Sequence, residues 1–283
     1  MTDVAISRRG LRVLKACFGL LLLFLYAPIL IMAVFSFNDS ITVTFPLSGF
    51  TLRWYREFLS NGELMVALRA SAIVAATSSA IAVALGISAA VALVRKRFFG
   101  KGAVSGLLLA PLVIPYLILG ISLLILFNAA AIPLSILTIA TGHVVISVPY
   151  TVLVLVPRLE RVSVSLEEAA RDLGASGPRT FRSVTFPLIL PAVISAFLVA
   201  FTLSFDEVVV ASFLAGDQVT FPVYLYSQLR FPTRLPQVIA LAVAVMAVSG
   251  FVVIGAEIGR RIADRRLATQ LASAGTPETR GIP

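Results

Sequence analysis

The stretch ACFGLLLLFLYAPILIMAVFSF, residues 16–37, contains 22 residues and no charged side chain. An α-helix needs about 20 apolar residues to cross the hydrocarbon core of a bilayer. Arg8, Arg9, Arg12 and Lys15 precede the stretch, and no small-residue cleavage site follows it. These features are typical of an uncleaved first transmembrane helix and not of a secretory signal peptide.

Five further apolar runs follow along the chain. They cover residues 65–94, 103–128, 133–156, 188–214 and 236–258. The chain of 283 residues is 59% hydrophobic and only 13% charged. A soluble domain has about 25% charged residues, so most of this chain must avoid water. The sequence therefore predicts an all-α integral membrane protein with six transmembrane helices.

The distribution of basic residues predicts the orientation of these helices. Of the 23 Lys and Arg residues, 18 lie before the first run, in the loops at 95–102 and 157–187, or after the last run. Cytoplasmic loops of membrane proteins are enriched in Lys and Arg. We therefore expect residues 1–15 in the cytoplasm, together with a disordered tail at 259–283, and residues 38–64 as a periplasmic loop.

Several classes of function are excluded by the composition. Cys17 and His143 are the sole cysteine and histidine, so neither a disulfide framework nor a His/Cys metal cluster is expected. The net charge of +9 comes from short loops between apolar runs, which indicates membrane topology and not nucleic-acid binding. The chain has no G-x-x-x-x-G-K-[ST] phosphate loop and hence is expected neither to bind a cofactor nor to hydrolyse ATP by that route.

The loop between the fourth and fifth runs is longer than a connector needs to be, and it has helical signals. Ser165 and Glu168 have the spacing of a capping box. Gly174 provides a helix stop, and Ser176 with Pro178 can begin a second short helix. An apolar stripe at helical spacing comprises Leu166, Ala169, Ala170 and Leu173. This stripe fits a helix lying on the bilayer surface or a helix that docks into a partner protein.

The same loop resembles a known motif. Glu168-Ala169-Ala170, three residues, Gly174, nine residues, then Val184-x-Phe186-Pro187 resembles the EAA loop of binding-protein-dependent ABC importer permeases. Val184 and Phe186 replace the Ile and Leu of that pattern, and both remain apolar. The resemblance covers about residues 65–258, which would form the five-helix core of a type I permease, with the first run as an extra helix.

This resemblance implies partners and roles. The loop would form coupling helices that seat in a cytoplasmic ABC ATPase dimer, and ATP with Mg²⁺ would be used by that partner. Glu168 would meet a basic residue of the ATPase, Ala169-Ala170 would permit close packing, Gly174 would allow the turn, and Pro187 would end the motif. The family also implies a second permease subunit, with a heterodimer favoured, an extracytoplasmic solute-binding protein, and the bacterial inner membrane as location.

Asp206 and Glu207 form the one adjacent acidic pair inside a predicted span. Ionisable residues inside a membrane are costly and usually functional. On a continuous helix, Asp206 would lie roughly 28 Å from Pro187, in the outer half of the membrane. One arrangement has Asp206 lining a central path and Glu207 held by a neighbouring helix. The pair is either a structural polar pair or a site that attracts a cationic solute.

The surrounding residues 203–213, LSFDEVVVASF, resemble the fifth-span signature of spermidine/putrescine-type permeases. That resemblance implies a polyamine substrate, whose ammonium ends would suit a carboxylate, and a pathway that also includes Ser204 and Phe205. An aromatic face such as that of Phe205 can supply cation–π contacts. Importers of other solutes belong to the same branch, so another solute is the alternative.

Two features leave further alternatives open. A stripe of small residues in the second run predicts close helix packing, with a pore wall as the alternative; it comprises Ala76, Ala80, Ala84, Ser88 and Ala92. Residues 51–58 contain Trp54 beside Arg53 and Arg56. They predict an interfacial helix that anchors the chain or contacts the solute-binding protein.

Two other classes of protein are weaker interpretations. An ion-coupled secondary transporter would use Asp206 or Glu207 as its ion site, but it would not require the motif around Glu168. A membrane enzyme would require a catalytic constellation, and the sequence offers no Ser/His/Asp or His-rich set.

Overall fold

The computed structural model describes residues 8–247 and residue 251. The predicted tail at 259–283, residues 1–7 and the end of the sixth apolar run therefore lie outside the described residues. The chain divides into two compact units, one formed by residues 61–227 and the other by residues 1–60 and 228–283. Within the described residues the structure is helical, apart from one isolated antiparallel bridge between Asn38 and Phe50.

In the part of the chain that the structure describes, four helical stretches are long and apolar enough to cross a membrane. They are α1 (Arg8–Phe35), α3 (Gly62–Arg95), α6 (Ile136–Glu160) and the stretch Gly177–Phe205, which ends with α9 (Phe186–Phe205). Two bent pairs, Lys101–Leu112 with Tyr116–Ala129 and Phe221–Gln228 with Pro232–Ala247, raise the number of candidate spans to six. The predicted all-α membrane fold is confirmed.

The third predicted helix, over residues 103–128, is wrong as a continuous element. The structure has α4 (Lys101–Leu109), a 3₁₀ turn (Ala110–Leu112) and α5 (Tyr116–Ala129), bent by 103°. Pro111 lies in the turn and Pro115 is the N-cap of α5. Proline has no N–H for the helical ladder, and it disfavours helical backbone in the residue before it. The two prolines therefore separate the run into two helices.

The fifth predicted run, over residues 188–214, is also interrupted. A short α8 (Gly177–Thr180) and a π-helical segment (Phe181–Thr185) lead into α9. Residue Asp206 is the C-cap of α9, and α10 (Val209–Leu214) is a separate helix. The acidic pair thus lies at a break between two helices, and not on one continuous helix as predicted.

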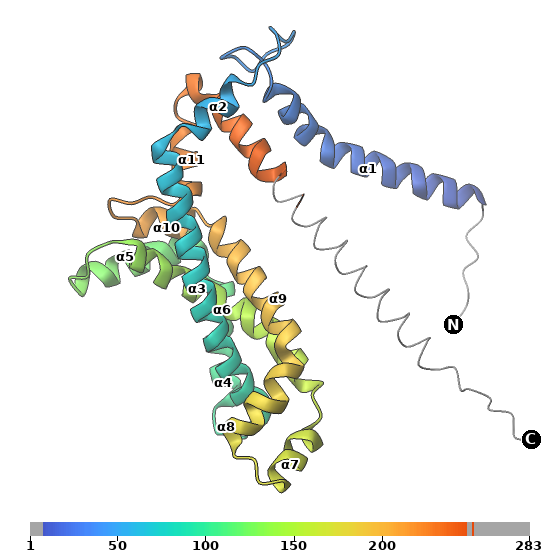
Figure 1. The fold of residues 1–283 in the computed structure, drawn as a ribbon, viewed down its shortest axis with the longest axis vertical. Helices are drawn as coiled ribbons and strands as arrows, with labels where there is room; N and C mark the ends of the chain where they lie inside the picture. The colour runs from blue at the N-terminus through green and yellow to red at the C-terminus, as the bar shows by residue number, and fades with distance from the viewer. Residues whose placement is uncertain (1–7, 248–250, 252–283) are drawn as a thin grey trace, which may run out of the picture. The chain divides into compact units, whose positions relative to one another are not determined.

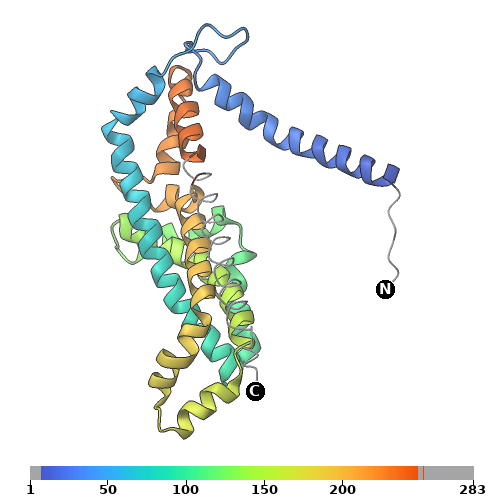
Figure 2. The same cartoon turned by 45° about the vertical axis from the view of Figure 1, so that its right-hand side comes forward.

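Three helices, α3, α6 and α9, form a bundle in the unit of residues 61–227. They pack against one another and run side by side (Figures 1 and 2). Next to this bundle, α10 packs on α5 and α6. One core cluster, which includes Ile139, Val210 and Leu214, joins α6 to α10. A second cluster, with Val83, Leu155 and Ile189, joins α3, α6 and α9. The short helices α7 (Val164–Asp172) and α8 lie at one end of the bundle in both views.

The other unit contains α1, α2 (Arg53–Leu59) and a helix within Pro232–Ala247. Only Phe35 of α1 is buried. The loop after α1 is fixed to α2, because the indole Nε1 of Trp54 donates to the carbonyl of Asn38 at 2.8 Å. Gln237 donates to Glu57 of α2. The short helix predicted from Trp54 and its neighbours is thus present.

Helices α3 and α6 approach closely at Gly86. A Cβ atom added at Gly86 would lie 2.2 Å from Thr151 Oγ1 and 2.8 Å from Thr151 Cβ. The same Thr151 hydroxyl donates to the carbonyl of Ala82 at 3.1 Å. The crossing of α3 and α6 therefore requires glycine at position 86.

We expect Gly86→Ala to lower the thermal unfolding midpoint of the purified protein. The added methyl group overpacks the α3–α6 interface, which costs about 1–3 kcal/mol. Gly106→Ala in α4 is the matched control, because nothing lies within 4 Å of its added Cβ. Alanine is a better helix former than glycine, so this control should keep or slightly raise the midpoint. Equal midpoints for the two variants would contradict the close approach.

Candidate functional site

The loop that contains the Glu168-Ala169-Ala170 motif folds into α7 and α8. Helix α7 begins at Val164 with Ser163 as N-cap. The Ser163 side chain makes no cap hydrogen bond to the backbone and instead lies 2.6 Å from Ser165 Oγ. The predicted capping box between Ser165 and Glu168 is therefore wrong. The prediction fails because Ser165 lies inside the first helical turn, and not at the N-cap position.

The predicted apolar stripe of α7 is largely exposed. Leu166 is 49% exposed and Leu173 is 89% exposed. Ala169 and the Glu168 carboxylate are exposed, and Ala170 is half-buried. An apolar stripe that its own chain leaves uncovered is typical of a binding surface.

The turn between the two short helices follows the prediction. Gly174 has φ +85°, which is left-handed backbone that favours glycine. Its N–H donates to the carbonyl of Arg171 at 2.8 Å, which ends α7. Ser176 is the N-cap of α8 and Pro178 lies in its first turn. Pro187 lies at the beginning of α9, where proline is well tolerated.

Glu167, which the sequence did not single out, is the buried carboxylate of the loop. Its side chain is 8% exposed, and its Oε1 lies 3.0 Å from Arg95 Nε at the end of α3. The hydroxyl of Thr185 donates to the same Oε1 at 3.0 Å. Arg95 Nη2 also donates to the carbonyl of Val162 at 2.8 Å. The contact between Arg95 and Glu167 joins residues 72 positions apart, so no local pattern could have revealed it.

A cavity of about 290 Å³ adjoins this ion pair. It is enclosed by the end of α3, by α7 and by the π-helical segment, with Arg95, Lys96, Glu167, Arg171 and Phe181 among its lining residues. Charged groups of both signs line it. Within the described chain no group of His, Cys, Asp and Glu has the arrangement of a metal site.

At the break after α9, the two adjacent carboxylates have different environments. Glu207 is 7% exposed, and its carboxylate accepts hydrogen bonds from the backbone N–H groups of Val209, Val210 and Ala211 at 2.9, 3.0 and 2.9 Å. It therefore caps α10. Asp206 is exposed. Glu207 is thus held inside the protein and Asp206 is exposed, while a role of Asp206 in a solute path stays a prediction.

Ser204 and Phe205, the other two predicted pathway residues, are tied into the helix bundle. Ser204 is 5% exposed, and its Oγ lies 2.7 Å from His143 Nδ1 and 2.9 Å from Ser78 Oγ. Phe205 is half-buried and stacks with Phe201, with ring centroids 5.9 Å apart. Of the four predicted pathway residues, Asp206 is exposed and Phe205 is half-buried, whereas Ser204 and Glu207 are buried.

His143 completes the buried polar group. It is fully buried in α6, and its Nε2 lies 3.5 Å from Glu207 Oε2. Together with Ser78 and Ser204 it connects α3, α6 and α9 to the cap of α10. Its partner Ser204 lies 61 positions away, so no local pattern in the sequence could have indicated this contact.

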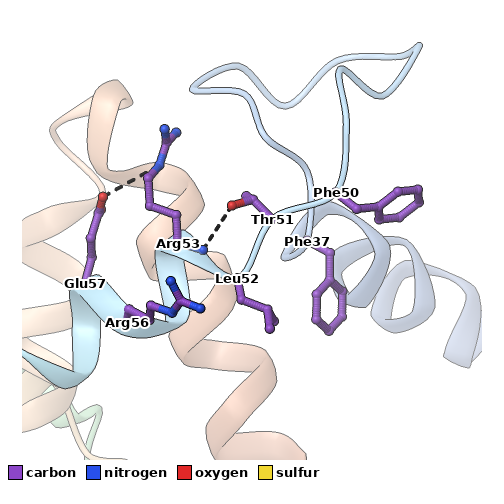
Figure 3. A pocket seen from close by; sticks show the side chains of 7 residues that line it. All are labelled: Phe37, Phe50, Thr51, Leu52, Arg53, Arg56 and Glu57. Carbon is purple, nitrogen blue, oxygen red and sulfur yellow. Dashed lines mark hydrogen bonds and ion pairs between the residues drawn. The ribbon is translucent and has the colours of Figure 1, made fainter.

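A separate hollow of about 650 Å³ lies in the unit that contains α2 (Figure 3). Its lining residues are Phe37, Phe50, Thr51, Leu52, Arg53, Arg56 and Glu57. Arg53 forms ion pairs with Asp39 at 3.2 Å and with Glu57 at 3.6 Å. The exposed Arg56 forms no ion pair with the described residues. The hollow therefore offers a guanidinium group beside aromatic and aliphatic side chains.

We expect Glu207→Ala to destabilise the protein more than Asp206→Ala does. Removing the Glu207 carboxylate leaves three backbone N–H groups without their acceptor, two of them buried, at about 1–3 kcal/mol for a buried unsatisfied group. Asp206 is exposed and its removal should leave the thermal midpoint nearly unchanged. The check is the unfolding midpoint of both variants in the same detergent, and equal losses would contradict the capping role.

Comparisons with known proteins agree with this architecture. Residues 82–268 match the family model of the binding-protein-dependent transport system inner membrane component. The putrescine transport system permease protein PotI of Escherichia coli K12 is 39% identical over 260 residues, covering 89% of this chain and 91% of that protein. The spermidine/putrescine transport system permease protein PotC of the same organism is 37% identical over 236 residues, covering 83% of this chain and 89% of that protein.

A solved structure shows the same fold. A chain of a bacterial ABC transporter involved in the import of the acidic polysaccharide alginate aligns with a TM-score of 0.68 and 16% identity, covering 92% of this chain and 99% of that chain. This likeness supports the type I permease fold and is silent on the solute. The family match extends over residues 82–268, and the relatives cover most of the sequence. The chain therefore belongs to the inner membrane components of binding-protein-dependent transport systems, the permease subunits of ABC importers.

Proposed function

We propose that this chain is half of the translocation pathway of an ATP-driven importer for polyamines such as putrescine and spermidine, or for a similar small cation. The observation that carries this proposal is the uncovered stripe of α7 beside the exposed Glu168 carboxylate. The relatives named for putrescine and spermidine transport support the solute. The chain itself is a transport component and not an enzyme.

In this proposal α7 and α8 dock into a separate cytoplasmic ABC ATPase dimer. Leu166 and Leu173 provide apolar surface, Ala169 and Ala170 allow a close approach, and Glu168 pairs with a basic residue of the ATPase. Gly174 sets the angle between the two helices through its left-handed backbone. ATP binding with Mg²⁺ closes the ATPase dimer, α7 moves with it, and the pathway opens to the other side of the membrane.

A second permease subunit completes the pathway, and two different permeases are favoured over two copies. The face of α3 with small residues supports the presence of a second subunit, because it is exposed within its own unit. Ala76, Ala80, Ala84 and Ser88 are exposed, whereas the buried face of α3 contains Val74, Ser78 and Ala82. Small residues permit close helix approach, and here the approach would be to the second permease or to the solute path.

Asp206 is the residue that we assign to the cationic solute. Its carboxylate is exposed at a helix break inside an apolar region, and an ionisable group there carries a cost that function offsets. The adjacent Phe205 ring is half-buried and offers part of its face to an ammonium group. Glu207 and Ser204 hold this arrangement from inside, through their contacts with His143.

An extracytoplasmic solute-binding protein would deliver the solute, and the hollow beside α2 is the proposed contact. Arg56 offers an unpaired positive charge within the described chain, and Leu52 is 54% exposed next to it. An acidic side chain of the binding protein would fit this combination.

We expect Glu168→Arg to weaken binding of the ATPase by about tenfold, which corresponds to about 1.4 kcal/mol. The reversed charge would repel the basic residue that Glu168 is proposed to meet. Asp217→Arg is the control, since Asp217 is an exposed acidic residue in the loop between α10 and α11 (Phe221–Gln228). The measurement is co-purification of the ATPase with the permease at matched membrane expression. Equal recovery with both variants would contradict the coupling role.

We expect Asp206→Asn to reduce uptake of putrescine at low concentration by about tenfold, as for a lost charged hydrogen bond of about 1.5 kcal/mol. Asp217→Asn removes the same charge in the neighbouring loop and should leave uptake unchanged. The measurement is initial uptake of labelled putrescine into cells that express the whole transporter. Normal uptake by Asp206→Asn would show that Asp206 is no part of the solute path.

A further inference from the structure

Glu167 and Glu168 are adjacent in α7 but face different surroundings. Neighbouring residues on a helix point about 100° apart. The Glu168 carboxylate is exposed, whereas Glu167 lies against Arg95 and Thr185 in the interior of the loop. One carboxylate is thus available to a partner and the other is used within the chain.

The Glu167 contacts tie three elements together at one point. Arg95 is the last residue of α3, Glu167 is in the first half of α7, and Thr185 is the last residue of the π-helical segment that leads into α9. The Glu167 and Arg95 side chains are 8% and 14% exposed, so solvent screens their attraction only weakly. Arg95 also donates to the carbonyl of Val162 just before α7.

Little else fixes α7 to α3. Helix α7 packs on α8 and on the π-helical segment, and its leucines Leu166 and Leu173 are exposed. The cavity of about 290 Å³ lies between α7 and the end of α3, where apolar packing would otherwise join them. The polar contacts of Glu167 and Arg95 therefore form the main link between α7 and α3.

We propose that Glu167, Arg95 and Thr185 form a strut that makes α7, α3 and α9 move as one body. This inference rests on the proposed function, since it supplies the path by which a displacement of α7 reaches the bundle. π-helical segments interrupt regular helices and are frequent sites of bending. The Thr185 bond to Glu167 restrains the segment through which α9 would otherwise bend away from α7. Glu167 is thus a positioning residue and Glu168 the docking residue.

Distance measurement tests the strut without any solute or ATPase. Spin labels would be attached at Leu85→Cys on α3 and at Leu173→Cys at the end of α7, because both leucines are exposed. The background would carry Cys17→Ser, so that the sole native cysteine is not labelled. We expect a narrow distance distribution in this background and a broad one after Glu167→Ala. Thr185→Val should also broaden it, whereas Thr185→Ser keeps the hydroxyl and should not. A narrow distribution in Glu167→Ala would overturn the proposal.

The functional arm uses the whole transporter in liposomes, with putrescine uptake and ATP hydrolysis measured in the same vesicles. We expect Thr185→Val and Glu167→Ala to keep ATPase association while uptake per ATP falls about fivefold or more, the low end of a coupling between sites. Arg97→Met is the control, because Arg97 is exposed and forms no ion pair with the described residues. A purely structural role would lower protein yield and leave uptake per ATP unchanged, which would overturn the strut.

A double variant separates the strut from the proposed function. If Arg95 and Glu167 act through a shared contact, Arg95→Met with Glu167→Ala should broaden the distances by less than the sum of the two single variants, because each residue also has a second partner, Val162 or Thr185. Additive broadening would contradict a shared contact. If the distances broaden as expected while Glu168→Arg leaves ATPase binding intact, the coupling function fails and the strut stands. If Glu168→Arg abolishes ATPase binding and the distances stay narrow in Glu167→Ala, the strut fails and the coupling function stands.

Discussion

Inside a bilayer, each backbone N–H and C=O must find its partner within the protein, and this constraint governs the interrupted helices of this chain. Where α9 ends at Phe205 and α10 begins at Val209, the first N–H groups of α10 have no helical acceptor. The Glu207 carboxylate accepts three of them, and His143 lies against it from α6. The break is therefore stable within the membrane region, and the exposed position of Asp206 depends on it.

Two pairs of adjacent acidic residues, at opposite ends of the stretch from α7 to α10, divide their roles in the same way. In each pair one carboxylate is buried and holds the backbone or a basic side chain, while its neighbour is exposed. Glu167 and Glu207 are the buried members, and Glu168 and Asp206 are the exposed ones. The buried carboxylate fixes the local backbone, so its neighbour is presented in one orientation. The two buried acids thus support the local backbone, and the two exposed acids are the ones proposed to bind the ATPase and the solute.

Local features of the fold could be predicted from the sequence, and long-range contacts could not. Length and hydropathy are local, so the apolar runs predicted the helices, and Gly174 predicted the turn after α7. The bend at Pro111 and Pro115 had a signal in the sequence that the hydropathy of the run obscured. By contrast, the pairing of Glu167 with Arg95 depends on how α3 and α7 meet. No periodicity links two residues that lie 72 positions apart.

The buried polar contacts of α6 also bear on the order in which the chain is made. Its Thr151 hydroxyl bonds to Ala82 on α3, which the ribosome completes earlier. Its His143 bonds to Ser204 on α9, which is synthesised 61 residues later. During biogenesis α6 can therefore pair with α3 at once, but its imidazole lacks a partner until α9 has emerged. The contact between His143 and Ser204 therefore forms only after α9 has been synthesised.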